Sequence, residues 1–154
     1  MTESPPAPPI LHGRKPPAPA PPASAAERAR QQFAQGLAYE RQGLGAPAIV
    51  SFSNALKLDP ELRDANYHIG MLFVRVGQYR AAEQAFAAEL ARHPDHLDAA
   101  RELGLSHARL GRTARAITEL ERVSRQRPRD GETWRALGFA YAQAGRGADA
   151  ERAL

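Results

Sequence analysis

Residues 63–96 read RDANYHIGMLFVRVGQYRAAEQAFAAELARHPDH and contain two apolar stripes at helical spacing. In the first half, Ile69 and Phe73 lie on one helical face, and Gly77 follows where a helix would end. The second half carries another stripe and then Pro94, which stops a helix because proline lacks the backbone N–H. That second stripe consists of Tyr79, Ala82, Ala85, Phe86 and Leu90. The stretch therefore predicts a helix, a tight turn and a second helix.

The same glycines and prolines return every 34 residues along the chain. They are Gly36, Gly70, Gly104 and Gly138; Gly43, Gly77, Gly111 and Gly145; and Pro60, Pro94 and Pro128. A period of this length is typical of stacked helical hairpins, whose neighbours complete a core that one hairpin cannot bury alone. The expected helices are Ala25–Gln42 and Pro47–Leu58, Leu62–Val76 and Gln78–Arg92, Leu97–Leu110 and Arg112–Gln126, and Gly131–Ala144 and Gly147–Leu154.

A glycine falls in the middle of the first helix of each pair, where it costs about 1 kcal/mol relative to alanine. We expect close approach of the partner helix to offset this cost. Small residues that could meet the glycines are Ala48, Ala82, Ala116 and Ala150, and bulky ones are Phe52, Phe86, Leu120 and Leu154.

These residues make the chain resemble the tetratricopeptide repeat family over residues 29–154. The matching positions are Ile69-Gly70, Leu103-Gly104 and Leu137-Gly138, the aromatics Tyr39, Phe73 and Tyr141, the recurring alanines and prolines, and Trp134. Departures from the pattern are Gln35, Glu89, His107 and Val123. The resemblance implies an all-α fold, a right-handed α-solenoid of helix-turn-helix repeats at about 29–62, 63–96 and 97–130 and a truncated fourth at 131–154. It says little about function, because members of the family bind many unrelated partners.

The solenoid is expected to occupy residues 25–154, after a Pro/Ala-rich tail at residues 1–24. The tail holds nine of the 13 prolines, so we expect it to be disordered or in polyproline II conformation. Its apolar island, Ile10-Leu11-His12, reads as a docking peptide or, more simply, as linker sequence. Ser24 and Glu27 form a capping-box pattern that opens the first helix.

Composition limits the classes of function. The chain has no cysteine, which excludes disulfides and thiol chemistry, and no apolar run long enough to span a membrane. The start shows no secretory signal, so we expect a cytoplasmic protein. Nineteen of the 21 basic residues are arginine and alanine is abundant, which we interpret as the codon bias of a GC-rich bacterial genome. Eight arginines lie in residues 101–129 without an aromatic among them, so we expect no nucleic-acid partner.

In this family, the first helices of successive pairs line a concave groove, and the resemblance places three rows of residues there. The apolar row is Leu37, Met71, Leu105 and Phe139; the middle row is Phe33, Tyr67, Arg101 and Arg135; the third is Arg41, Arg75, Arg109 and Gln143. The apolar row could equally be ordinary core between helices. A groove of this kind would hold a peptide with apolar and acidic residues. Recurring acids at Asp64, Asp98 and Glu132 would complement helix dipoles.

A subset of the family clamps a C-terminal carboxylate with cations, but the corresponding positions here are Phe33, Leu37, His68, Asp98 and Glu102. A clamp of that kind is therefore not expected. The run His93-Pro94-Asp95-His96 groups potential metal ligands, yet a turn explains it better, and we expect no metal or other cofactor. No phosphate loop or nucleophile motif is recognisable, so we do not expect this segment to be an enzyme.

The leading hypothesis is a protein-interaction module that binds a partner peptide or protein in the groove. The alternative is the N-terminal recognition arm of a larger repeat-fused enzyme, such as a glycosyltransferase or sulfotransferase, since the sequence stops within a repeat on the apolar residue Leu154. Self-association through this uncapped end is a further possibility.

Overall fold

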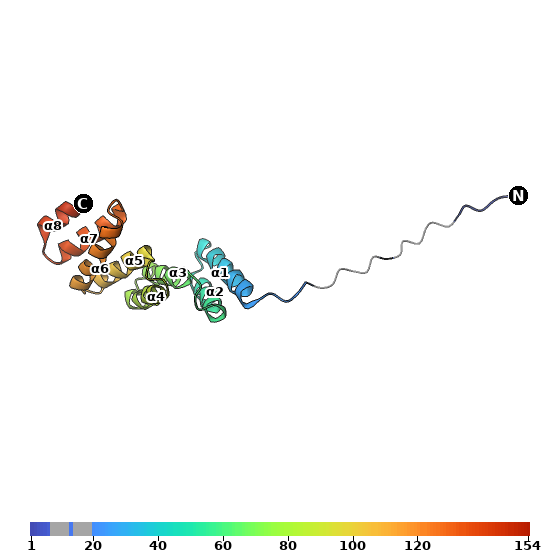
Figure 1. Cartoon of the computed structure of the whole chain (residues 1–154), viewed down its shortest axis with the longest axis horizontal. Coiled ribbons are helices and arrows are strands. Elements are labelled where there is room, and N and C mark those ends of the chain that lie inside the picture. The colour runs from blue at the N-terminus through green and yellow to red at the C-terminus, as the bar shows by residue number, and fades with distance from the viewer. Residues whose placement is uncertain (7–12, 14–19) are drawn as a thin grey trace.

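A computed structural model describes residues 1–6, 13 and 20–154, and its helices follow one another in a row (Figure 1). The helices are α1 (Ala25–Arg41), α2 (Gly45–Leu58), α3 (Ala65–Arg75), α4 (Tyr79–Arg92), α5 (Leu97–Arg109), α6 (Thr113–Gln126), α7 (Gly131–Gln143) and α8 (Gly147–Ala153). The described residues before α1 form no helix or strand. The apolar island predicted at Ile10-Leu11-His12 lies outside the described residues.

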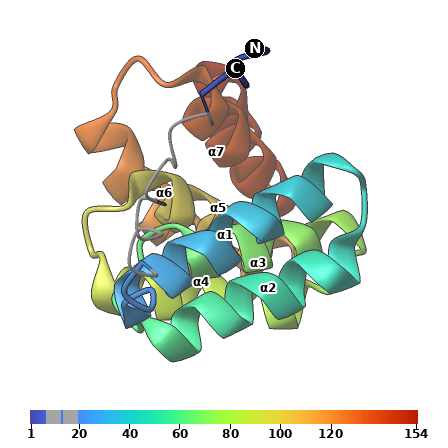
Figure 2. The same ribbon diagram turned by 90° about the vertical axis from the view of Figure 1, so that its right-hand side faces the viewer.

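The helices pair as α1/α2, α3/α4, α5/α6 and α7/α8, and each pair packs on the next (Figures 1 and 2). Across pairs, α3 contacts α5 and α5 contacts α7. We call α1, α3, α5 and α7 the inner helices and α2, α4, α6 and α8 the outer helices. The predicted all-α solenoid is confirmed, and no strand occurs among the described residues.

The mid-helix glycines lie where a bulky side chain of the outer helix presses on the inner helix. A Cβ added to Gly70 would stand 2.5 Å from the ring of Phe86, and one on Gly36 would stand 2.6 Å from Phe52. Gly104 faces Leu120 in the same way, at 2.7 Å. The close approach expected from the sequence is confirmed, and the bulky side chains, not the alanines, make it.

Each tight turn within a pair contains a glycine with a positive φ. Gly77 has φ +74°, and Gly43, Gly111 and Gly145 are alike. In the α3–α4 turn, the N–H of Gln78 donates to the carbonyl of Phe73 at 2.9 Å, which satisfies a carbonyl at the end of α3.

Two helix starts differ from the prediction by more than one residue, and those of α4 and α6 differ by one. Helix α2 begins at Gly45, two residues before Pro47. Proline is tolerated there because the N–H groups in the first turn of a helix have no partner within the helix, so the N–H that proline lacks is not missed. Helix α3 begins at Ala65 instead of Leu62, because Asp64 adopts a left-handed conformation with φ +72°. A residue in that conformation cannot continue a right-handed helix.

Glu89 of α4 holds this left-handed residue. Its side chain is fully buried, and its Oε1 accepts a hydrogen bond from the backbone N–H of Asp64 at 2.8 Å. Glu89 stands at a position where the repeat pattern has alanine, so the departure noted in the sequence has a structural role. It joins α4 to the start of α3.

The core runs through the stack and thins at the C-terminal end. Phe52, Phe86 and Leu120 are fully buried at equivalent positions, whereas Leu154 is 82% exposed. Self-association through this end stays a prediction, which light scattering at increasing protein concentration tests.

His107 on α5 makes stability sensitive to acid. It stands at the family's aromatic position, is buried, and has Nδ1 3.5 Å from Oε1 of Glu83, which also pairs with Arg112. Burial lowers the pKa of His107, because it disfavours the charged imidazolium. The unfolded chain therefore binds more protons, and stability should fall as the pH drops below about 6.5.

We therefore expect His107→Phe to reduce the loss of Tm between pH 7.5 and pH 5.5, because the variant has no imidazole to protonate. Thermal melts of both proteins at the two pH values measure this. Equal losses of Tm in the two proteins would contradict the assignment.

Candidate binding surface

The apolar row of the inner helices is half-buried along its length. Leu37, Met71, Leu105 and Phe139 each pack against a core cluster and keep part of their surface exposed. The row therefore belongs both to the core and to the inner surface, and the two interpretations of the sequence are not exclusive.

The middle row changes character along the solenoid. Phe33 packs on Phe52, with ring centroids 5.3 Å apart, and Tyr67 lies 5.0 Å from the ring of His96. Arg101 and Arg135, further along, are already engaged. Arg135 pairs with Glu132, one turn earlier on α7.

Arg101 is held by three carboxylates and is not an available cation. Its Nη1 lies 3.3 Å from Oδ1 of Asp98 and 3.2 Å from Oδ2 of Asp130, and its Nε lies 3.3 Å from Oε1 of Glu102. The Arg101 side chain is only 15% exposed. Asp98 is shared with Arg127 at 2.7 Å. Arg101, which the sequence placed in the groove as a binding residue, thus belongs to an ion-pair network within the protein.

The third row differs, and we call Arg41, Arg75 and Arg109 the arginine ladder. All three side chains are exposed, and within the described part of the chain none lies within 4.0 Å of a carboxylate oxygen. Acids beside the ladder have other partners: Glu40, next to Arg41, pairs with His68 at 2.8 Å, and Glu102, two turns before Arg109 on α5, pairs with Arg101 at 3.3 Å. The ladder therefore carries uncompensated positive charge.

Among the described residues, Arg109 is the member of the ladder that lies over aromatic rings. Its guanidinium carbon lies 5.8 Å from the ring centroid of Tyr79 on α4 and 5.0 Å from that of Phe139 on α7. Both are within the range of cation–π attraction. The side chain is thus contacted from the helix pairs before and after its own, while its N–H donors stay available.

A small cavity of about 90 Å³ lies beside Arg109, between the end of α3, the start of α4 and the middle of α5. It is lined by Val74, Tyr79, Glu102, Leu105, Ser106 and Arg109. Burial raises the pKa of Glu102, although the neighbouring Arg101 acts in the opposite direction. Tyr79, Val74 and Glu102 were absent from the predicted groove. The sequence signals for Tyr79 are its place at the start of the second apolar stripe and two residues after Gly77, and neither indicates that its ring lies beside Arg109.

The recurring acids do not share one role. Asp98 and Glu132 lie in the first turns of α5 and α7, as expected for residues that complement helix dipoles. Asp64 precedes α3, makes no capping hydrogen bond with its side chain and pairs with His96 instead. Asp64 still stands at the N-cap of α3, where a negative charge complements the helix dipole, so the ion pair with His96 is a second role beside the predicted one.

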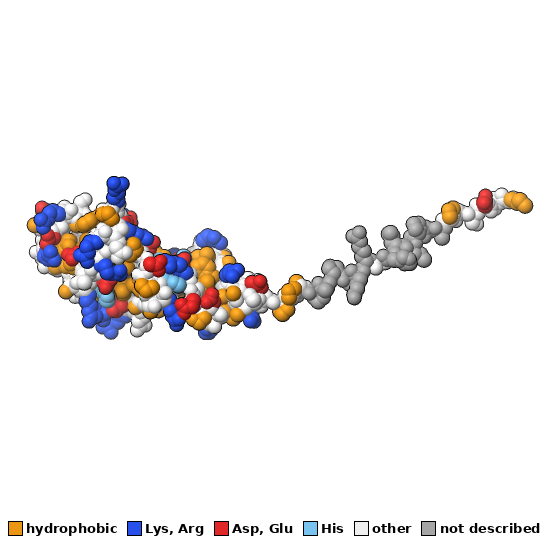
Figure 3. Space-filling view, viewed as in Figure 1, with side chains coloured by type: hydrophobic (Ala, Val, Ile, Leu, Met, Phe, Trp, Pro, Cys, Tyr) orange, Lys and Arg blue, Asp and Glu red, His pale blue; other side chains and the backbone are white. Residues whose placement is uncertain are grey.

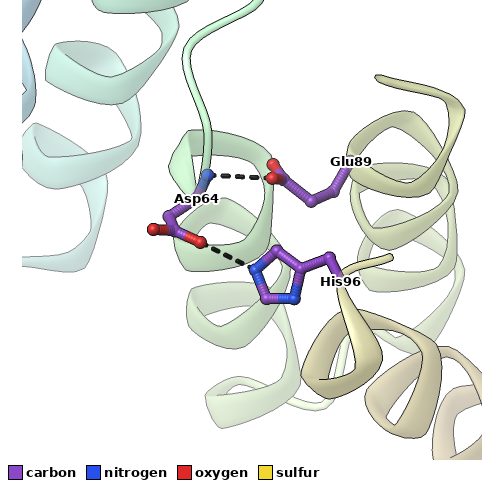
Figure 4. A group of neighbouring side chains, drawn as sticks. All are labelled: Asp64, Glu89 and His96. Atoms are coloured by element: carbon purple, nitrogen blue, oxygen red, sulfur yellow. Dashed lines mark hydrogen bonds and ion pairs between the residues drawn. The ribbon is translucent and has the colours of Figure 1, made fainter. Parts of the chain in front are cut away.

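Asp64, Glu89 and His96 are the one group of possible metal ligands that the described residues bring together, with ligand atoms within 4.8 Å of one another (Figure 4). Of the two other residues of the predicted cluster, His93 borders the group, with Nε2 3.9 Å from Oε1 of Glu89, and Asp95 lies outside it. His93 contacts the carbonyl of Glu61 at 3.1 Å, and Asp95 pairs with Arg63.

The tautomer of His96 argues against a metal at this group. The backbone N–H of Ala99 donates to Nδ1 of His96 at 3.1 Å, so Nδ1 carries a lone pair and the ring proton sits on Nε2. Nε2 lies 2.7 Å from Oδ1 of Asp64 and donates that proton to it. A metal at Nε2 would displace the only ring proton and leave an imidazolate. The group is better described as a hydrogen-bonded junction between turns.

Basic side chains gather mainly over the C-terminal half of the helical region, with acidic ones among them (Figure 3). The described helices include none that is long and apolar enough to cross a membrane. The geometry is that of a helical-repeat protein whose inner helices share one surface.

The family model for the tetratricopeptide repeat matches residues 67–124 and 106–154, and these two ranges together cover more than half of the chain. The chain therefore belongs to the tetratricopeptide repeat family. A comparison with curated protein sequences gives no match.

Similar solved structures share the fold. A crystal structure of the MamA protein has a TM-score of 0.74 and 25% identity, over 81% of this chain and 68% of that one. MamA from Desulfovibrio magneticus RS-1 has a TM-score of 0.75 and 22% identity, over 81% and 71%. The first tetratricopeptide domain of Spaghetti (RPAP3), bound to the HSP90 peptide SRMEEVD, has a TM-score of 0.72 and 21% identity, over 77% and 95%.

Proposed function

We propose that this chain is a protein-interaction module that binds a partner polypeptide on the surface of its inner helices, across the arginine ladder. The observation that carries the proposal is the absence of any carboxylate partner for Arg41, Arg75 and Arg109 among the described residues, while Glu40 and Glu102 beside them pair with other residues. Exposed charge without a partner favours an oppositely charged ligand and speeds its association. The half-buried apolar row beside the ladder supplies contacts for apolar side chains.

The proposed partner carries acidic and apolar residues, but it does not use the chaperone-tail mode. The Spaghetti domain binds an HSP90 peptide. At the clamp positions, this chain has two acids, Asp98 and Glu102, and both are engaged with Arg101. A terminal carboxylate at those positions would meet negative charge. The expected cytoplasmic location, the bacterial origin and the lack of a nucleic-acid partner stay predictions.

The double charge reversal Arg75→Glu/Arg109→Glu is expected to weaken partner capture by about tenfold or more, since each reversal replaces an attraction of about 1 kcal/mol by a repulsion. Pulldown from a lysate with quantitative mass spectrometry measures the loss. Because both side chains are exposed, Tm should stay within about 2 °C of the parent.

The matched control is Arg115→Glu/Arg125→Glu, which makes the same change of net charge on α6, at two exposed arginines without ion pairs among the described residues. It should leave capture unchanged. If both double variants lose the partner equally, only net charge matters, and the arginine ladder is not the binding surface.

A further inference from the structure

We propose that the cavity between α3, α4 and α5 is a subsite for an aliphatic side chain of the partner, with an adjacent acidic residue bound by Arg109 at its rim. This inference rests on the proposed function and specifies which chemistry the inner surface recognises.

The cavity has the size and walls for an aliphatic group. Its volume of about 90 Å³ is about three times the roughly 30 Å³ that one liquid water molecule occupies, which gives room for a small aliphatic group. Val74, Leu105 and the ring of Tyr79 provide apolar walls on one side, and Glu102, Ser106 and Arg109 line the other. An aliphatic group against the first three residues displaces water from their apolar surface, which favours binding.

Arg109 is prepared to bind a carboxylate. A free arginine side chain loses much conformational freedom when it is fixed by a ligand, and this loss weakens binding. Here the rings of Tyr79 and Phe139 already support the guanidinium from two sides. Its planar N–H donors can pair with both oxygens of a carboxylate.

Glu102 sets the orientation of the ligand. Its carboxyl group lines the cavity and is tied to Arg101 at 3.3 Å, while burial raises its pKa. An acidic group that entered the cavity would face Glu102 at close range. The acidic group of the ligand therefore stays at the rim, at Arg109, and the apolar group enters.

A basic ligand does not fit the same place. Arg109 borders the cavity and Arg75 directly follows Val74 on α3, so a cationic group at the rim would meet positive charge. Charge complementarity selects a ligand that is acidic at one end and aliphatic at the other.

The test uses two blocked dipeptides as probes, N-acetyl-leucyl-glutamate amide and N-acetyl-leucyl-glutamine amide, titrated into the full chain with methyl-labelled leucine and valine. We expect saturable NMR shifts of the Leu105 and Val74 methyl groups, with the glutamate probe binding about fivefold more tightly. Arg109→Gln should remove this preference, and Arg115→Gln should keep it. Exchange of the leucyl for an alanyl group should weaken binding as well.

Equal affinity of the two probes for the parent protein, or shifts confined to other methyl groups, would refute the subsite. So would a preference for glutamate that survives Arg109→Gln in a protein with unchanged Tm. If the probes fail while the Arg75→Glu/Arg109→Glu variant still loses its partner, the subsite is wrong and the wider interaction surface stands. If neither the probes nor the partner depend on these arginines, both proposals fail.

Discussion

Replacement of Phe86 by alanine is expected to lower the free energy of unfolding by about 4 kcal/mol, in the range observed for buried phenylalanine. Phe86 is fully buried in a cluster with Ala82 and Ala99, so the substitution leaves a cavity between α3, α4 and α5. Because repeats in a solenoid are stabilised by their neighbours, a cavity in the second pair should also weaken the third. Chemical denaturation followed by circular dichroism measures the loss.

Leu154→Ala is the matched control for Phe86→Ala. Leu154 occupies the equivalent position in the last pair but is 82% exposed, so its truncation should cost less than about 0.5 kcal/mol. Similar losses for the two substitutions would mean that burial does not distinguish the positions in solution.

Gly70→Ala is expected to destabilise the protein by about 2 kcal/mol, although alanine is the better helix former. The added Cβ would stand 2.5 Å from the Phe86 ring, and overpacking of this kind typically costs 1–3 kcal/mol. At the equivalent Gly138, the Cβ would stand 3.0 Å from the exposed side chain of Leu154, which can move aside. Gly138→Ala should therefore be neutral or stabilising by up to about 1 kcal/mol.

A double-mutant cycle separates overpacking from other effects of Gly70→Ala. In the Phe86→Ala background the clash is absent, so the same glycine substitution should cost nothing or stabilise the helix. If Gly70→Ala costs the same in both backgrounds, the contact with Phe86 is not the cause.

The fold was predictable because its signals repeat. Mid-helix glycine, turn glycine and terminal proline return at each period, and each has a local physical reason that the structure bears out. The start of α3 was not predictable in this way. Leu62 and Arg63 are ordinary helix formers, and only the buried Glu89, 25 residues later, holds Asp64 in the conformation that delays the helix.

The candidate surface was predictable in outline and not in detail. The period places Arg75, Arg101 and Arg109 on inner helices, but it does not tell which of them is paired. Arg101 meets Asp130, 29 residues away, because the turn before α7 folds back onto α5. Ion pairs of this kind depend on which side chains the tertiary structure brings together, and residue spacing in a single sequence does not predict those contacts.

The turns at 93–96 and 127–130 occupy equivalent places in successive repeats, but they are not interchangeable parts. His96 donates to Asp64, whereas at the corresponding place Asp130 accepts from Arg101. A graft of residues 127–130 onto positions 93–96 would bring an aspartate against Asp64. Tyr67 stands where α5 has Arg101, so the two carboxylates would lack the arginine that holds Asp130, and only the grafted Arg127 would offset them. Anyone who lengthens or shuffles this array must therefore move each turn together with the inner helix that it was selected to match.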